Sequence, residues 1–197
     1  MALTLITAPT SEPISLAEAA AHLRIDADEE QALVRLLIQS ARETIERVTR
    51  RSLMTTVWDY TRDGFAFDPV TLCSVGFALP RIPVASVASV KYYASTTGTD
   101  TTFSSADYYV SLADSQCRIW PAYGVAWPAI QPRPDGVRIR FTAGATTAAL
   151  VPAALRQAML LLIADGYENR EAGQQGAAYQ TNPTVDRLLW PYRNLEA

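Results

Sequence analysis

The segment from Asp28 to Arg51 constrains the fold more than any other stretch, because its pattern predicts one long amphipathic helix. Apolar and small residues recur in it with the three- and four-residue spacing of a single helix face. The residues of this predicted face are Leu33, Leu36, Leu37, Ser40, Ala41, Thr44, Ile45 and Val48. Asp26 or Asp28 is expected to cap the start of the helix, because a carboxylate there accepts hydrogen bonds from free backbone N–H groups.

The rest of the circumference of this helix carries charges of both signs. One interpretation is a surface exposed to water, and the other is a surface that packs on a neighbouring copy of the chain. The candidate contacts with a neighbouring copy are Arg35, Arg42, Glu43, Glu46 and Arg47. The segment alone leaves both interpretations open.

Two other helical segments are predicted to pack with this helix. Ser15 and Glu18 form a capping-box pattern at the start of a short helix over residues 16–23. A later helix starts at Pro152, and its apolar residues are so widely spread around it that burial on most sides is expected. Its main stripe is Leu155, Ala158, Met159, Leu162, Ile163, Gly166 and Tyr167. We therefore predict an antiparallel helical bundle.

Residues 52–150 have a different composition, with no Glu and many Thr, Val, Tyr, Ser, Pro and Gly residues. The strands predicted by alternation and by β-branched or aromatic content cover residues 55–61, 84–93, 108–112, 117–120 and 137–142. Residues 113–116 are expected to form the turn of a hairpin. Because short strands joined by turns pair antiparallel, the sequence predicts a small antiparallel β unit inserted between helices, which is an α+β fold.

These patterns divide the chain into an N-terminal arm, a main domain and a C-terminal tail. The arm is residues 1–14, the main domain is residues 15–172 with helices in 15–51 and 152–172 and the β insertion in 52–150, and the tail is residues 173–197. The tail combines a Gly- and Gln-rich flexible linker with a short docking helix. The candidate docking residues are Leu188, Leu189, Trp190 and Tyr192. The alternative is that this helix folds back onto its own domain.

The sequence offers little for catalysis. It has one histidine, His22, and two cysteines, Cys73 and Cys117, and it lacks the nucleophile-elbow, phosphate-loop and zinc-protease motifs. Residues 26–30 resemble the start of a calcium loop, but Gln31 and Leu37 stand where that loop has its Gly and Glu. We therefore predict no metal site and no enzyme activity. Catalysis by carboxylates alone is the alternative, although Asp59, Asp63, Asp107 and Asp114 stand where turns and strand ends commonly have Asp.

Charge and hydropathy argue against binding to nucleic acid or to a membrane. The formal net charge is −3, which gives no basic field for holding DNA. A helix-turn-helix over residues 15–51 would present carboxylates to DNA at the start of its second helix, and their charge has the wrong sign. The opening residues lack the features of a signal peptide, and no stretch is long enough to span a membrane, so a soluble cytosolic protein is expected.

Aromatic residues gather in the predicted β unit. They are Tyr92, Tyr93, Tyr108, Tyr109, Trp120, Tyr123 and Trp127. Such residues more often fill the core of a small sheet than form a platform for stacking on sugars. The platform interpretation keeps a β-rich carbohydrate-binding or adhesion module as the alternative function.

Several short segments follow one another in a recognisable order. They are residues 13–19, 22–24, 49–53, 79–90, 107–108, 118–121, 137–144, 151–158 and 167–170. This order resembles that of the head–tail connector (adaptor) proteins of long-tailed bacteriophages and phage-derived gene transfer agents. The resemblance extends over nearly the whole chain, although the linker near residues 173–180 has no clear counterpart.

The resemblance implies a structural protein without enzyme activity or cofactor. It implies a homo-oligomeric ring, commonly of twelve copies, between the portal protein and the stopper or tail-completion protein. Such a ring continues the channel through which DNA passes without sequence-specific binding. The expected location is the neck of a virion or phage-like particle, after synthesis in the bacterial cytoplasm, and the resemblance favours docking of the tail helix on the portal.

Overall fold

The computed structural model of the chain describes residues 1–26, 30–66, 75–95, 97–112, 117–169 and 183–193. Within these ranges the chain forms α-helices and antiparallel strands, so the fold is α+β. The chain divides into two compact units. The β unit contains Met1–Pro9 and Thr55–Gly144, and the helical unit contains Thr10–Met54 with the described residues from 145 onward.

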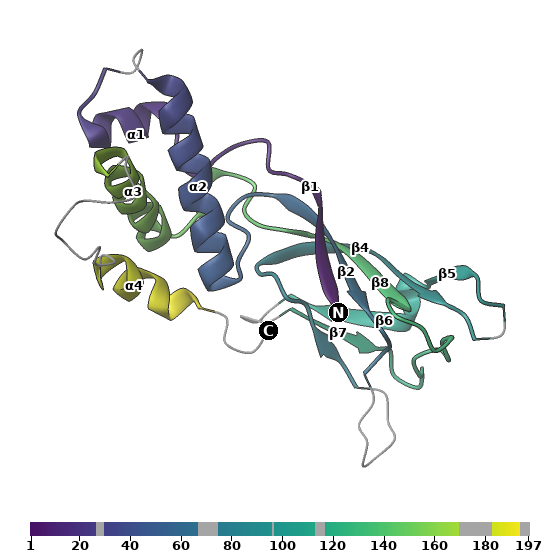
Figure 1. Cartoon of the computed structure of the whole chain (residues 1–197). Coiled ribbons are helices and arrows are strands. Elements are labelled where there is room, and N and C mark those ends of the chain that lie inside the picture. The colour runs from purple at the N-terminus through teal and green to yellow at the C-terminus, as the bar shows by residue number, and fades with distance from the viewer. Residues whose placement is uncertain (27–29, 67–74, 96, 113–116, 170–182, 194–197) are drawn as a thin grey trace. The chain divides into compact units, whose positions relative to one another are not determined.

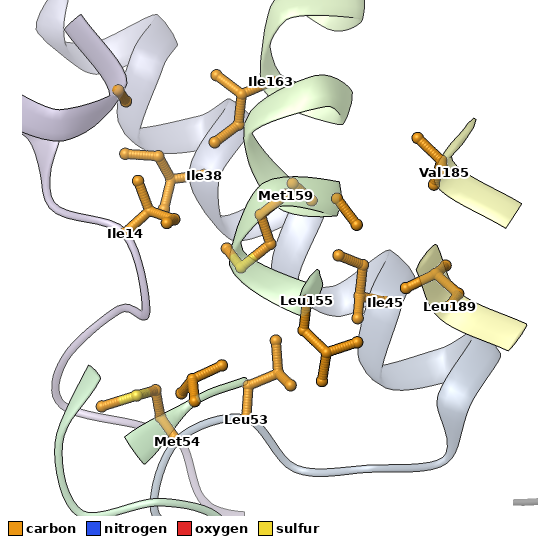
Figure 2. Packing of buried hydrophobic residues seen from close by; sticks show 14 of the residues in the cluster. Ile14, Ile38, Ile45, Leu53, Met54, Leu155, Met159, Ile163, Val185 and Leu189 are labelled. Atoms are coloured by element: carbon orange, nitrogen blue, oxygen red, sulfur yellow. The ribbon is translucent and has the colours of Figure 1, made fainter. Parts of the chain in front are cut away.

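The helical unit is built from four α-helices that share one hydrophobic cluster (Figure 1). The helices are α1 (Leu16–Leu23), α2 (Gln31–Thr49), α3 (Ala153–Glu168) and α4 (Pro183–Leu189), with 3-10 helices η2 (Ala148–Leu150) and η3 (Trp190–Tyr192). At the start of α1, the Glu18 backbone N–H donates to Ser15 Oγ and the Ser15 N–H donates to the Glu18 carboxylate, which is the predicted capping box. Figure 2 shows side chains from α2, α3 and α4 meeting in the cluster, with Ile45, Leu155 and Met159 fully buried.

The start of α2 and its buried face differ from the prediction. The helix begins at Gln31, and its N-cap residue is Glu30, in a left-handed conformation (φ 53°) without a side-chain cap; Asp28 lies outside the described residues. The buried residues of α2 are Val34, Ile38, Ala41, Arg42, Ile45, Glu46 and Thr49. Leu36 is 62% exposed and Val48 is 38% exposed, so their predicted burial is wrong. The reason is that two charged residues belong to the buried face, and a search for apolar spacing passes over them.

The β unit contains two antiparallel sheets (Figure 1). The five-stranded sheet has the order β1-β2-β8-β4-β5, and the three-stranded sheet has the order β3-β7-β6. The strands are β1 (Ala2–Thr7), β2 (Thr56–Arg62), β3 (Phe77–Ala78), β4 (Val84–Tyr93), β5 (Asp100–Phe103), β6 (Tyr108–Ser111), β7 (Arg118–Pro121) and β8 (Val137–Ala143), with 3-10 helix η1 (Ser105–Asp107) before β6. β6 and β7 pair antiparallel as the hairpin prediction requires, although residues 113–116 lie outside the described residues.

A second hydrophobic cluster fills the β unit. In β8, Val137, Ile139 and Phe141 are fully buried and alternate with Arg138 and Arg140, which is the period-two pattern of a strand with one buried face. Aromatic rings make up much of this cluster, with Phe65 stacked on Trp127 at 4.6 Å between ring centroids. Each unit thus has its own core.

The described chain passes between the two units after Pro9, after Met54 and after Gly144, and the last two of these crossings are close together. In the β unit, Thr56 at the start of β2 pairs with Ala143 at the end of β8. In the helical unit, Met54 and Ala145 form a parallel bridge, and the Ala145 N–H donates to the Leu53 carbonyl at 3.2 Å. The crossing after Met54 and the crossing after Gly144 therefore lie side by side.

Candidate interaction site

Arg42 lies at the centre of a buried charge network inside the helical unit. Its Nε donates to Glu12 Oε2 at 2.8 Å, and its Nη1 donates to Glu46 Oε2 at 3.0 Å. The other oxygen of Glu46 accepts the Leu53 backbone N–H at 2.8 Å. Arg42 and Glu46 are each 6% exposed. The network therefore ties the segment before α1, the middle of α2 and the segment after α2 to one another.

This network corrects the expected set of contacts with a neighbouring copy. The expectation that Arg42 and Glu46 lie on an exposed face is wrong, because both are buried in the helical unit. Arg35, Glu43 and Arg47 are exposed, so these three remain available to a partner. The carboxylate of Glu12 was the feature of the sequence that could have indicated a partner for Arg42, and the prediction of the α2 surface did not use it.

The exposed face of α2 also contains apolar residues, and a groove lies next to it. Leu36 and Val48 are exposed beside the charged residues. The groove has a volume of about 320 Å³ and lies between α2 and the segment leading into α1. Its lining residues are Ser11, Glu12, Ile14, Ser15, Leu16, Arg35 and Ile38. This part of the helical unit can bind an apolar side chain flanked by charged groups.

The predicted docking residues of the C-terminal tail are divided between the core and the surface. Val185 and Leu189 of α4 are buried in the helical cluster (Figure 2). Leu188 and Tyr192 are partly buried against the same cluster. Trp190 is 65% exposed. In the structure, therefore, the helix folds back onto its own unit, as the alternative interpretation holds, and Trp190 is the exposed member of the predicted set.

Two arginines lie against the aromatic rings of η3. The Arg51 guanidinium is 5.9 Å from the centroid of the Tyr192 ring, and burial lowers the pKa of Arg51. The Arg193 guanidinium is 5.5 Å from the centroid of the Trp190 ring and also binds Asp186 at 3.1 Å. The exposed indole of Trp190 is thus held beside a cation rather than left as an isolated side chain.

The aromatic residues of the β unit fall into a buried and an exposed group. Tyr108 and Trp127 are buried in the core, as predicted for a small sheet. Tyr109, Trp120 and Tyr123 are 61%, 41% and 99% exposed. Tyr109 of β6 lies directly opposite Trp120 of β7, so these two rings form a cross-strand pair on the surface of the three-stranded sheet.

The polar chemistry of the described residues is structural. Burial raises the pKa of the Cys117 thiol to about 11, so this cysteine is protonated at neutral pH and is a poor nucleophile. Cys73 lies outside the described residues. No group of three or more His, Cys, Asp or Glu side chains gathers in the described part of the chain as metal ligands would. Nor does any helix formed by the described residues have the length and apolar character needed to cross a membrane.

Comparison with known proteins places the chain near one group. The family model of phage gp6-like head–tail connector proteins matches residues 13–107. Among curated proteins, none matches the sequence. A chain in the neck of an empty gene transfer agent particle, computed with C6 symmetry, is similar with 26% identity and a TM-score of 0.79. A chain in the neck of a native particle, computed with C12 symmetry, is similar with 27% identity and a TM-score of 0.76. Both similarities cover 100% of this chain and 97% of the other.

Proposed function

From the premise that this chain belongs to the phage gp6-like head–tail connector family, we propose that it is a structural subunit of a ring in the neck of a phage or phage-like particle. The observation that carries the proposal is the end-to-end similarity to neck chains in particles with C6 and C12 symmetry. In this role the ring joins the portal protein to the stopper or tail-completion protein and continues the DNA channel. The similarity favours this role over a carbohydrate-binding module.

The charges of the chain suit a conduit for DNA. A protein that grips DNA does so by neutralising phosphates with Lys and Arg, and its affinity follows the number of such contacts. This chain has 17 Lys and Arg residues against 20 Asp and Glu residues, and its net charge is −3. A channel made of such subunits lets DNA move without holding it.

The helical unit supplies the proposed contacts with neighbouring proteins. The helices act as an antiparallel bundle, and the exposed Arg35, Glu43 and Arg47 of α2 face a neighbouring copy, where a cation of one copy meets a carboxylate of the next. Trp190 acts as the anchor for the portal, because an exposed Trp next to an Arg is typical of residues that dominate binding energy in interfaces. Val185 and Leu189 hold α4 in place beneath it.

Electron microscopy of the purified chain mixed with portal-bearing heads tests the proposed function. The expected result is a ring of density below the portal with sixfold or twelvefold symmetry. Heads that bind no copies of the chain, under conditions in which the chain stays folded, would contradict the proposal.

Two neighbouring substitutions separate docking from folding. We expect Trp190→Ala to keep the unfolding temperature of the chain while weakening its association with portal-bearing heads, because the indole is exposed. Leu189→Ala is expected to lower the free energy of unfolding by about 2–5 kcal/mol, because it removes a buried side chain from the helical cluster. Thermal unfolding and co-sedimentation with heads measure the two effects. Normal association of the Trp190→Ala variant would exclude Trp190 as the anchor.

A further inference from the structure

The two sheets of the β unit end in four edge strands, and an edge strand presents backbone N–H and C=O groups that can pair with another chain. The edges of the five-stranded sheet are β1 and β5, and those of the three-stranded sheet are β3 and β6. Natural proteins protect such edges by making them short, by placing charged residues on them or by covering them. The four edges of this unit differ in how well they are protected.

Two of the edges are protected. β3 has only two residues, and the Arg62 guanidinium lies 4.6 Å from the centroid of the Phe77 ring. β5 begins with Asp100, whose carboxylate binds Arg138 at 2.9 Å and Lys91 at 3.5 Å. A strand that approached β5 would meet this cluster of charges.

The β1 edge carries no charged residue, and its one irregularity is a register shift between Leu5 and Thr7. The first charged side chain of the sequence is Glu12, so β1 and its flanking residues have none. Leu5 is 45% exposed and Ile6 is 46% exposed. β1 has six residues, and among the described residues its only strand partner is β2. It is an exposed, uncharged and largely apolar edge.

The β6 edge has the same character. Its four residues carry no charge, Tyr109 is 61% exposed, and Leu112 just after the strand is 52% exposed. Trp120 of β7 lies opposite Tyr109, and its indole covers Gly76 so closely that a Cβ there would be 2.4 Å from the ring. Gly76 thus leaves the room for Trp120 to extend the apolar surface of β6 across the sheet.

We propose that β1 of one copy pairs with the β6 edge of the next copy, so that Leu5 packs beside Tyr109. This inference rests on the proposed ring and identifies the surfaces that close it. Because β1 and β6 are different surfaces of the same unit, their pairing is head-to-tail, and head-to-tail contacts form a ring when the rotation from copy to copy closes. Pairing of β1 with β1 would end at a dimer. A second copy is the partner because the similar chains come from necks computed with C6 and with C12 symmetry.

Site-specific crosslinking in assembled necks tests this pairing. The background variant is Cys73→Ser, and Cys117 stays because it is buried and 2% exposed. Leu5→Cys and Tyr109→Cys are introduced together, and necks assembled on portal-bearing heads are treated with a short bis-maleimide. The expected result on a denaturing gel is a ladder of multimers. A mixture of the two single variants is expected to yield dimers only.

Competing arrangements give different gels. A second double variant combines Leu5→Cys with Thr102→Cys in β5. If this variant gives multimers and the Leu5→Cys/Tyr109→Cys variant does not, β1 pairs with β5 and the proposal is overturned. Dimers from Leu5→Cys alone would show pairing of β1 with itself and would also overturn it. If micrographs show rings but the Tyr109→Cys pair stays monomeric, the edge pairing is wrong while the connector function stands. Absence of rings from the unmodified chain would overturn both.

A charge on the edge provides a second test. Leu5→Lys is expected to abolish ring density on heads, because a lysine on an edge strand opposes pairing. The matched control is Leu150→Lys in the helical unit, where an exposed leucine is replaced in the same way and rings are expected to persist. Circular dichroism confirms that both variants are folded. Normal rings from folded Leu5→Lys protein would exclude β1 from the contact.

Discussion

Arg42 shows how a single charged residue can make one face of a helix part of the interior of its unit. It is buried, and carboxylates of Glu12, Glu46 and Glu43 lie 2.8, 3.0 and 3.7 Å from its guanidinium nitrogens. Removing two charges from water costs several kcal/mol each, and good geometry with further hydrogen bonds offsets that cost. Glu46 has such a further bond from the Leu53 N–H. The network therefore specifies how the segments around α2 are placed, and its buried members, Arg42 and Glu46, are not available to a partner protein in the folded unit.

Reversing this charge is expected to unfold the helical unit. Arg42→Glu places a fourth carboxylate beside Glu12, Glu43 and the buried Glu46, leaves Glu46 without its cation and is expected to lower the free energy of unfolding by about 3–5 kcal/mol. Arg47→Glu, on the exposed side of the same helix, is expected to change it by less than about 0.5 kcal/mol. Urea unfolding measures both. Equal stability of the two variants would show that the network contributes nothing to the fold.

Asp59 and Arg140 form a second residue-scale contact, in the β unit, which depends on pH. Arg140 Nε and Nη2 donate to the two Asp59 oxygens, both at 2.7 Å. These hydrogen bonds hold the pKa of the Asp59 carboxyl below its ordinary value of 3.8. The folded chain thus binds this proton more weakly than the unfolded chain. The stabilisation is present above pH 3.8 and is lost as the pH falls through the lower folded pKa.

The substitution Asp59→Asn removes the pH dependence that this carboxyl gives to the stability of the fold. We expect the variant to be less stable than the parent at neutral pH, and the difference in free energy of unfolding to shrink below pH 3.8. Chemical denaturation over a pH series measures it, with Asp135→Asn as the control because Asp135 is exposed. A difference that grows on acidification would mean that the carboxylate opposes folding.

At the scale of elements, α3 provides the centre of the helical core. Leu155, Ala158, Met159 and Ile163 of this helix are fully buried against α2 and α4 (Figure 2). Met159→Ala is expected to lower the free energy of unfolding by about 2–5 kcal/mol, because a buried side chain is replaced by a cavity. Leu150→Ala removes a side chain that is 66% exposed and should cost much less. Thermal unfolding of both variants checks this, and an unchanged Met159→Ala midpoint would contradict the core assignment.

The sequence allowed the types of most elements to be predicted, but not the pairing between distant ones. Local periodicity predicted α3 and the alternation in β8, because each signal lies within one segment. In β4 the predicted alternation is wrong, because register shifts between Val84 and Ser86 and between Val87 and Ser89 interrupt it. The face of α2 was misplaced because Arg42 and Glu46 occupy buried positions through contacts with Glu12 and Leu53, which are distant in sequence. β1 was predicted as an extended arm, since its pairing with β2 depends on residues more than fifty positions away.

The candidate interaction surfaces also depend on contacts between distant elements, which the sequence does not reveal. The sequence singled out Leu188, Leu189, Trp190 and Tyr192 as a group, but whether each is buried depends on where α4 packs. Trp190 alone of these is exposed. The edges of β1 and β6 were not predicted as surfaces, because an edge exists only once the order of strands is known. The absence of charge in the first eleven residues was the available signal.

At the scale of the whole molecule, charge decides how the chain behaves toward DNA. With a net charge of −3, the chain is expected to form no complex with a duplex of about 30 base pairs at protein concentrations of about 10 µM in physiological salt. An electrophoretic mobility assay measures this. A complex whose affinity falls steeply with salt would reveal a basic surface and contradict the role of a passive conduit.

The side-by-side crossings at Met54 and Ala145 make the β unit an exchangeable cassette. Because its two ends already meet, the helical frame accepts an insert of another length with little added loop-closure entropy. For an engineer, the same junction is a graft point. A reporter domain with adjacent termini can replace residues 55–144, with residues 1–9 removed as well, and the helical frame retains its own core.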